Sequence, residues 1–369
     1  MSTHGPAPHP PPNGSRRRAV CFAALLAVLA AWPARTARAW SDTGHDLITE
    51  EAVQRLPQPL RSLFADPPSL NRLKAASIAA DGRTDAQSPH YSPAEKPRHF
   101  FDIDAVADEP PPFATFPRDR AEAERQFGAE TFEKTGTAPW AAGEALDRLV
   151  DALRDGRTGE VFAAAGDLAH YATDLHMPLH TTKNWDGQLT GNHGIHKALE
   201  VGLVNRRLDA CRAEVQSDRR VVHYLADPTD HLFDWLIAAH ARVEPILEAD
   251  TAARQATRYN PAQHPEDLDQ VDSAQARPYY KALAEELAKR GSPEAAALRE
   301  ASAHLADLLY TAWVRAGKPV TLQAAAQAAD AEPTPPYWLI ALAVGLLLLL
   351  VWPRRRPARR GGDASGPTE

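Results

Sequence analysis

The 369-residue chain contains only two cysteines, Cys21 and Cys211, so at most one internal disulfide can form. Cys21 lies in an N-terminal segment that we expect to be removed, which leaves Cys211 alone. A fold held together by disulfides is therefore excluded, and cohesion must come from a hydrophobic core and from any bound metal. Cys211 itself is predicted to be a small buried apolar residue.

The sequence also lacks a run of alternating β-branched and polar residues, and it has no internal repeat. Its net charge is −7, although residues 1–39 and 353–369 each carry five arginines. The segment between these ends is therefore more acidic than the whole chain. Because an acidic surface does not attract polyanions broadly, a phosphate substrate would have to be held locally by metal ions or a few cations.

Apolar residues recur at three- and four-residue spacing, with good helix formers between them, in six segments. These are residues 48–56, 140–154, 160–175, 195–208, 231–249 and 295–316. Residues 85–118 contain seven prolines and cannot form a continuous helix. We therefore predict an all-α fold, with residues 40–320 forming a single compact multi-helix domain with long loops.

Residues 1–39 have the layout of a secretory signal peptide. Three arginines at 16–18 precede an apolar run from 19 to about 32, and Ala37-Arg38-Ala39 matches an A-x-A cleavage site. Cleavage after Ala39 would make Trp40 the first residue and free an α-amine, which together with the Trp40 carbonyl can bind a metal ion. A cut a few residues away is the alternative. Either cut predicts an exported protein.

The C-terminal segment is typical of a membrane anchor. Residues 337–352 are uncharged with aromatic residues at both ends, and the tail 353–369 is rich in arginine. We predict a transmembrane helix, a basic cytoplasmic tail and a periplasmic or other extracytoplasmic domain, joined through an Ala/Pro linker at 321–336. Sixteen residues span roughly 24 Å, which is short for a bilayer. A buried helix and a sorting tail removed after export remain alternatives.

Two histidine–carboxylate pairs indicate metal binding. His170 and Asp174, like His196 and Glu200, are four residues apart, so a helix places each pair on one face. His180 follows Pro178, where the first helix must end or kink, and is free to turn toward a second cation. One such pair alone is more often an ordinary surface pair, but two pairs within thirty-five residues favour metal.

His176 and His193 fall outside this pattern. On helical spacing, His176 lies on the flank of the helix relative to His170 and is predicted to be at the surface or to support a ligand. The residues alone leave manganese or iron open, although histidine-rich sites with carboxylates in an exported protein favour zinc.

An ordered set of motifs extends this pattern: WSDTGHDLITEEA, IAADGR, RHFFDID, HYATDLHMPLH and HGIHKALE. Together they resemble the superfamily of trinuclear zinc enzymes that unites fungal and plant single-strand nucleases with bacterial zinc phospholipases C. The similarity spans the predicted mature domain from Trp40 to about Gly317, with the motifs in the order of the family.

The resemblance implies three zinc ions per chain and assigns their ligands. One zinc would be held by Asp81, His99, His170 and Asp174. A second would be held by the Trp40 amine and carbonyl, His45 and the other oxygen of Asp174, and the third by His180, His196 and Glu200. Water between the first two zinc ions would lose a proton near neutral pH. Asp81 would orient this water, and Arg83 is the candidate for stabilising the transition state, although it lies one residue closer to Asp81 than in the nucleases.

The substrate class follows less directly from the resemblance. The spacing from Trp40 to His45 matches the nucleases, and Phe100 and Asp102 match positions that stack and hydrogen-bond a base; core packing is the alternative for Phe100. Glu200 matches the phospholipases instead. We predict a zinc-dependent phosphoric diester hydrolase acting on single-stranded nucleic acid, with no obligate protein partner. The alternatives are a phospholipase C-type hydrolase of phospholipids and a catalytically inactive, zinc-stabilised binding module.

Overall fold

The computed structural model describes residues 40–107 and 109–320. Within this part of the chain the backbone is mostly helical, with no strand and one isolated β-bridge between Phe101 and Gly136. The buried apolar residues form one hydrophobic core, so the predicted compact all-α domain is confirmed. The predicted signal peptide, linker, membrane helix and basic tail lie outside the described residues. No helix of the described part is both long and apolar enough to cross a bilayer.

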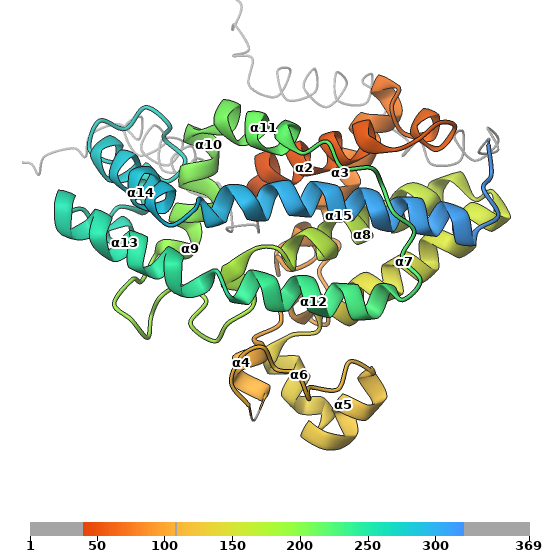
Figure 1. Ribbon diagram of the computed structural model, residues 1–369, viewed down its shortest axis with the longest axis horizontal. Helices are drawn as coiled ribbons and strands as arrows, with labels where there is room; N and C mark the ends of the chain where they lie inside the picture. The colour runs from red at the N-terminus through yellow and green to blue at the C-terminus, as the bar shows by residue number, and fades with distance from the viewer. Residues whose placement is uncertain (1–39, 108, 321–369) are drawn as a thin grey trace, which may run out of the picture.

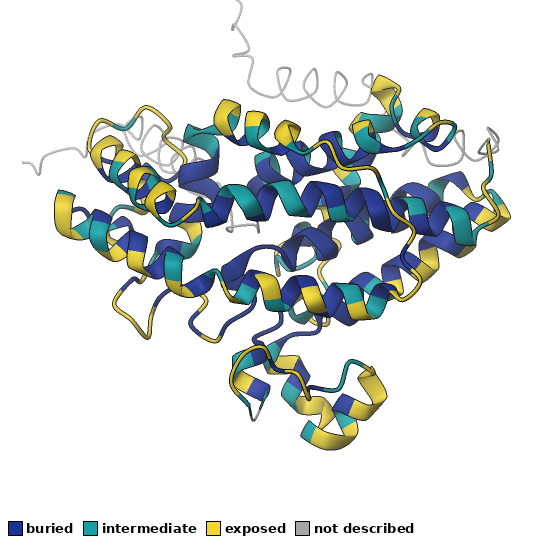
Figure 2. Cartoon of the chain, viewed as in Figure 1, coloured by how far each residue is buried: buried dark blue, intermediate teal, exposed yellow. Residues whose placement is uncertain are grey.

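Eight helices of thirteen or more residues build the body of the domain. In chain order they are α2 (Ser41–Arg55), α3 (Pro67–Gly82), α7 (Ala138–Asp155), α8 (Thr158–Asp174), α12 (Pro228–His240), α13 (Val243–Thr257), α14 (Arg277–Lys289) and α15 (Pro293–Arg315). The central helix α15 follows the long axis of the molecule and contacts α2, α7, α8 and also α11 (Leu208–Ser217) (Figure 1). It is buried along most of its length (Figure 2).

Shorter elements occupy the proline-rich connection, which forms no continuous helix, as predicted. It contains η2 (Lys96–His99) and α4 (Ile103–Val106), and α5 (Arg120–Phe127) and α6 (Ala129–Thr135) follow. The segment α4 to α6 projects from the body (Figure 1). Phe101 joins this segment to the body, because its ring packs on Phe132 of α6, Trp140 of α7 and Phe233 of α12.

Two predicted helices are interrupted. Residues 231–249 belong to two helices, α12 and α13, which are separated at Ala241 and Arg242. The helix breaks here because Pro245, in the first turn of α13, has no N–H to donate a hydrogen bond to the carbonyl four residues earlier. Residues 195–208 form α9 (Ile195–Lys197), the π-helical η4 (Ala198–Leu203) and α10 (Val204–Arg206), and α11 begins at Leu208. A π-helical turn widens the backbone and often occurs at functional sites.

Close packing between α3 and α8 depends on Gly166. A Cβ at this position would lie 2.4 Å from the Ala76 Cβ and 2.6 Å from the Ala76 carbonyl carbon. We expect Gly166→Ala to lower the free energy of unfolding by about 1–3 kcal/mol through overpacking, measured by chemical denaturation. At Gly143, in the middle of α7, a Cβ would meet no neighbouring atom within 4 Å, so Gly143→Ala is the matched control and should stabilise by about 0.5–1 kcal/mol. Equal effects of the two substitutions would contradict this role of Gly166.

Candidate metal centre

The predicted ligands come from the ends of several helices. Asp81 lies in the last turn of α3, His99 is the last residue of η2, and His170 and Asp174 lie in the last turn of α8. His45 lies in α2, His180 ends η3 (Pro178–His180), and His196 and Glu200 lie in α9 and η4. The helices support these side chains rigidly, and side chains at the ends of different helices can come together at one place. Most of the predicted ligand side chains are buried.

Asp81, His99 and His170 form the first candidate metal group. The Oδ1 atom of Asp81 lies 3.5 Å from His99 Nδ1 and 3.6 Å from His170 Nε2. Asp174 Oδ2 joins them at 3.3 Å from His99 Nδ1 and 3.2 Å from His170 Nε2. These four side chains are the ones predicted for one cation, and the structure brings them together.

The second candidate group comprises His45, His170 and Asp174. His45 Nε2 lies 3.4 Å from Oδ1 of Asp174, the carboxylate oxygen that does not face His99. The carboxylate of Asp174 therefore faces the first group with one oxygen and the second with the other, as predicted for a bridging ligand.

Trp40 is fully buried beside this second group. Its indole Nε1 donates a hydrogen bond to the carbonyl of Thr173, at 3.0 Å, directly before Asp174. Its backbone has a φ of 50°, in the left-handed region that a bulky residue rarely adopts. A chain that begins at Trp40 has no preceding peptide bond to define φ, and so would not carry this strain.

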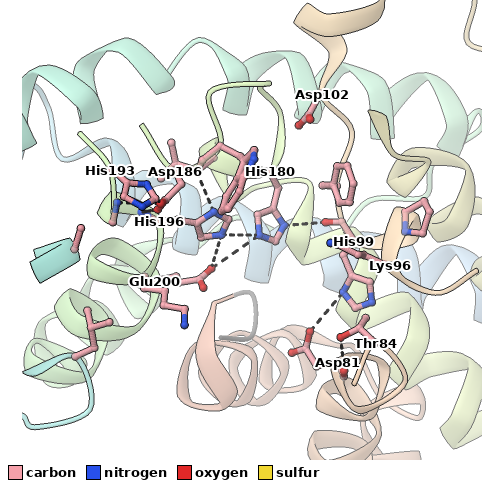
Figure 3. Close-up of a pocket in the computed structure, with 18 of the residues that line it drawn as sticks. Asp81, Thr84, Lys96, His99, Asp102, His180, Asp186, His193, His196 and Glu200 are labelled. Atoms are coloured by element: carbon pink, nitrogen blue, oxygen red, sulfur yellow. Dashed lines mark hydrogen bonds and ion pairs between the residues drawn. The ribbon is translucent and has the colours of Figure 1, made fainter. Parts of the chain in front are cut away.

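His180, His196 and Glu200 form the third candidate group. His196 Nε2 lies 3.1 Å from His180 Nε2 and 3.1 Å from Glu200 Oε2 (Figure 3). Glu200 belongs to the π-helical η4, an interruption of the helix that the sequence did not predict, but it keeps the predicted spacing of four residues from His196.

In four of the histidines, a hydrogen bond to the ring nitrogen that points away from the centre determines which nitrogen faces the centre. His170 Nδ1 lies 2.6 Å from the Ser77 carbonyl, His180 Nδ1 lies 2.8 Å from the His99 carbonyl, and His196 Nδ1 lies 2.9 Å from the Trp185 carbonyl. His45 Nδ1 lies 3.0 Å from Thr173 Oγ1. A ring nitrogen next to a carbonyl must carry the proton, and His45 Nδ1 must also carry it, because the Thr173 hydroxyl donates its own proton to the His170 carbonyl. Nε2 is therefore the free ligand atom in these four rings, as is usual for metal-binding histidines.

His99 is oriented the opposite way. Its Nδ1 faces Asp81 and Asp174, whereas its Nε2 lies 3.5 Å from Glu95 Oε1. The buried Glu95 also accepts hydrogen bonds from Arg83 and from the Tyr171 hydroxyl. Neither Glu95 nor Tyr171 was predicted from the sequence. Glu95 precedes His99 by four residues and Tyr171 directly follows His170, and this closeness to two predicted ligands was the available signal.

Several of the atoms that could bind a metal ion in these groups are buried and have no hydrogen-bond partner in the described structure. They are His45 Nε2, Asp81 Oδ2, both carboxylate oxygens of Asp174, and Glu200 Oε2. Burial raises the pKa of Asp81 and of Glu200, and it lowers the pKa of His180 to about 3, so this histidine stays neutral. Unpartnered buried polar atoms are rare and costly. Divalent cations bound by these nitrogen and oxygen atoms would remove that cost, so the residues fit metal ions.

A cavity of about 940 Å³ opens over the first and third groups. Phe100 and Asp102, the predicted substrate-binding residues, both line it, together with Asp81, His180 and Glu200. Burial raises the pKa of Asp102 to about 8, and its Oδ1 has no hydrogen-bond partner among the residues that the structure describes. A protonated carboxyl offers both a donor and an acceptor.

Arg83 does not line this cavity. One of its guanidinium nitrogens lies 3.0 Å from Glu95 Oε1, 2.7 Å from Asp167 Oδ1 and 2.9 Å from the Tyr171 hydroxyl. This geometry makes Arg83 a support for the Glu95–His99 contact, and its predicted role at the transition state stays a prediction.

Two further histidine clusters lie apart from the centre. His176 is buried, with Nδ1 2.8 Å from the Ala172 carbonyl and Nε2 2.7 Å from His304 Nδ1. Its predicted surface position is therefore wrong, because α15 covers this flank of α8. The other cluster is His264, Glu266 and Asp267, in which Asp267 is already paired with Tyr259 and Ser273.

Comparison with protein-family models and with curated proteins finds no match to this chain.

Proposed function

We propose that this protein is a zinc-dependent phosphoric diester hydrolase that cleaves single-stranded nucleic acid. One observation carries the proposal: three adjoining groups of candidate ligands, two of which share His170 and Asp174, contain buried atoms without hydrogen-bond partners in the described part of the chain, next to a large cavity. The proposed metal load is three zinc ions per chain, held by the residues predicted from the sequence.

The residues of the chain have separable roles in this proposal. When bound, the cations supply Lewis-acid catalysis, activation of water and neutralisation of phosphate charge. Asp81 Oδ2, which has no hydrogen-bond partner among the described residues, would accept a hydrogen bond from the attacking water and orient it. Phe100 would stack an unpaired base, and Asp102 would hydrogen-bond the edge of that base.

The proposal includes the cellular location. The signal-peptide pattern of residues 1–39 supports export, and the pattern of residues 337–352 supports an anchor that keeps the domain on the extracytoplasmic face. Both of these arguments for the location rest on the sequence pattern.

A phospholipase C-type activity is the second candidate. Glu200 supports it, because the matching position in the resembling phospholipases is a glutamate, and apolar residues such as Leu179, Pro261 and Leu268 line the cavity. A tethered domain would also lie beside a lipid substrate.

Metal removal and a choice of substrates test the proposal together. Protein beginning at Trp40 should hydrolyse single-stranded polynucleotide much faster than phosphatidylcholine vesicles, lose this activity in a chelator, and regain it when zinc is returned. Release of acid-soluble nucleotides and of phosphocholine are the two measurements. Hydrolysis of the vesicles alone would favour the phospholipase. Activity on neither substrate, with zinc retained, would show that the protein is a binding module.

A further inference from the structure

The cavity extends beyond the metal ligands on the side of His196. Lys96 lies near His99, whereas Asp186, His193 and His196 lie on the opposite side of His180 (Figure 3). This end of the cavity is lined by Trp185, Asp186, His193, Gly194 and Lys197 in addition to His196. None of the roles assigned above for nucleic acid uses Trp185 or Lys197.

Trp185 presents an aromatic surface that contacts His196. Its side chain is 49% exposed, which is unusual for tryptophan, and its ring centroid lies 5.7 Å from that of His196 in an edge-to-face arrangement. Its carbonyl accepts the hydrogen bond from His196 Nδ1. The indole is therefore positioned relative to His196 but keeps one surface open to the cavity.

The segment that carries Trp185 is rigidly built. The buried Asp186 carboxylate accepts hydrogen bonds from the backbone amides of Gly194 and His196, at 3.0 and 3.3 Å, and lies 2.6 Å from His193 Nδ1. These contacts close residues 186–196 into a loop. A ligand at this end would meet a surface that is already organised, so little ordering cost is expected on binding.

Unpaired cations flank the acidic centre at both ends of the cavity. Lys197 follows His196, while Lys96 and Lys134 lie toward Phe100, and all three are exposed. Within residues 40–107 and 109–320, no carboxylate forms an ion pair with any of these three lysines. The Trp185 end of the cavity thus combines an aromatic side chain with the positive charge of Lys197, whereas at the Phe100 end Lys96 and Lys134 are accompanied by Glu133.

We propose that Trp185 and Lys197 form a second nucleotide subsite, across the metal centre from Phe100. The inference rests on the proposed nuclease function and deepens it: one base stacks on Trp185 while the phosphate next to the scissile one contacts Lys197. A polynucleotide offers a base and a phosphate on both sides of the bond that breaks. A phospholipid has one phosphodiester and no base, so it would leave this end unused.

Trp185→Ala tests the stacking half of the subsite. We expect the KM for the dinucleotide TpT to rise about tenfold relative to the KM for methyl p-nitrophenyl phosphate, while zinc content is retained. Trp185→Phe keeps a ring and should restore most of the loss. Tyr224→Ala removes a ring that is 48% exposed and lies outside the cavity, so it is the matched control. In a chelator, where hydrolysis stops, oligothymidylate should quench the tryptophan fluorescence of wild-type protein more than that of Trp185→Phe.

Lys197→Gln tests the phosphate half. Loss of one contact to single-stranded phosphate should reduce the slope of log KM for oligothymidylate against log salt concentration by about 0.7. Lys281→Gln, at an exposed lysine of α14, should leave the slope unchanged.

The outcomes separate this inference from the function on which it rests. Equal effects of Trp185→Ala on TpT and on the small diester, together with an unchanged salt slope in Lys197→Gln, would overturn the subsite while leaving the nuclease intact. A wild-type protein that cleaves no nucleotide substrate would overturn the function itself. A Trp185→Ala protein whose main defect is in hydrolysis of phosphatidylcholine would assign this end to a lipid.

Discussion

Replacing Asp174 by asparagine is expected to abolish most of the activity and to lower the zinc content by more than one ion per chain. Asp174 is fully buried, and its two oxygens face different groups: Oδ1 lies 3.4 Å from His45, and Oδ2 lies 3.2 Å from His170. Asparagine keeps the volume but removes the negative charge that two cations would share in the proposed centre. The loss in kcat/KM should exceed the roughly 10- to 100-fold typical of residues that only support a ligand.

Two comparisons make this prediction specific. Asp167→Asn changes the same functional group two turns earlier in α8, where the carboxylate pairs with Arg83 and Arg148, and should keep all three zinc ions. His196→Gln removes a ligand of one group only and should cost one zinc ion. If Asp174→Asn lost no more metal than His196→Gln, a bridging role for Asp174 would be wrong. Zinc is measured by elemental analysis of dialysed protein, alongside steady-state kinetics.

A protein that retains Ala39 is expected to bind about one zinc ion fewer than a protein that begins at Trp40. A peptide nitrogen joined to Ala39 has no basic lone pair to donate, whereas a free α-amine does. The buried indole of Trp40, bonded to the Thr173 carbonyl at 3.0 Å, fixes the start of α2 beside Asp174. We expect the activity of the longer protein to fall roughly tenfold or more.

The two proteins differ by one residue, so they form a matched pair. Mass spectrometry should establish each N-terminus before the zinc content and kcat/KM are compared. Similar thermal stability in a chelator would show that both proteins are folded. Full activity with three zinc ions in the protein that retains Ala39 would rule out Trp40 as a ligand through its α-amine.

The sequence predicted the helical class and the longest helices well, because α7, α8 and α15 carry regular apolar spacing. It did not predict α3 or α14. The break between α12 and α13 depends on a single proline in an otherwise regular pattern, and the π-helical η4 depends on packing against the rest of the domain. At Gly202 a Cβ would lie 2.0 Å from the Tyr280 hydroxyl, a contact between residues far apart in the sequence. Periodicity within one segment contains no information about such contacts.

The candidate site was predictable where ligands lie one helical turn apart, as for His170 with Asp174 and His196 with Glu200. The contributions of Asp81, His99 and His45 followed from the resemblance, and the structure brings these side chains to the same place. The supporting contacts of Glu95 and the exposed surface of Trp185 depend on how separate segments meet. Local spacing did not indicate them.

X-ray diffraction at the zinc absorption edge, on crystals of protein beginning at Trp40, tests the central claim most directly. We predict three anomalous peaks: one among Asp81, His99, His170 and Asp174, one among Trp40, His45 and Asp174, and one among His180, His196 and Glu200. A map from zinc-supplemented crystals with no peak in these groups, or with peaks only elsewhere, would contradict the account.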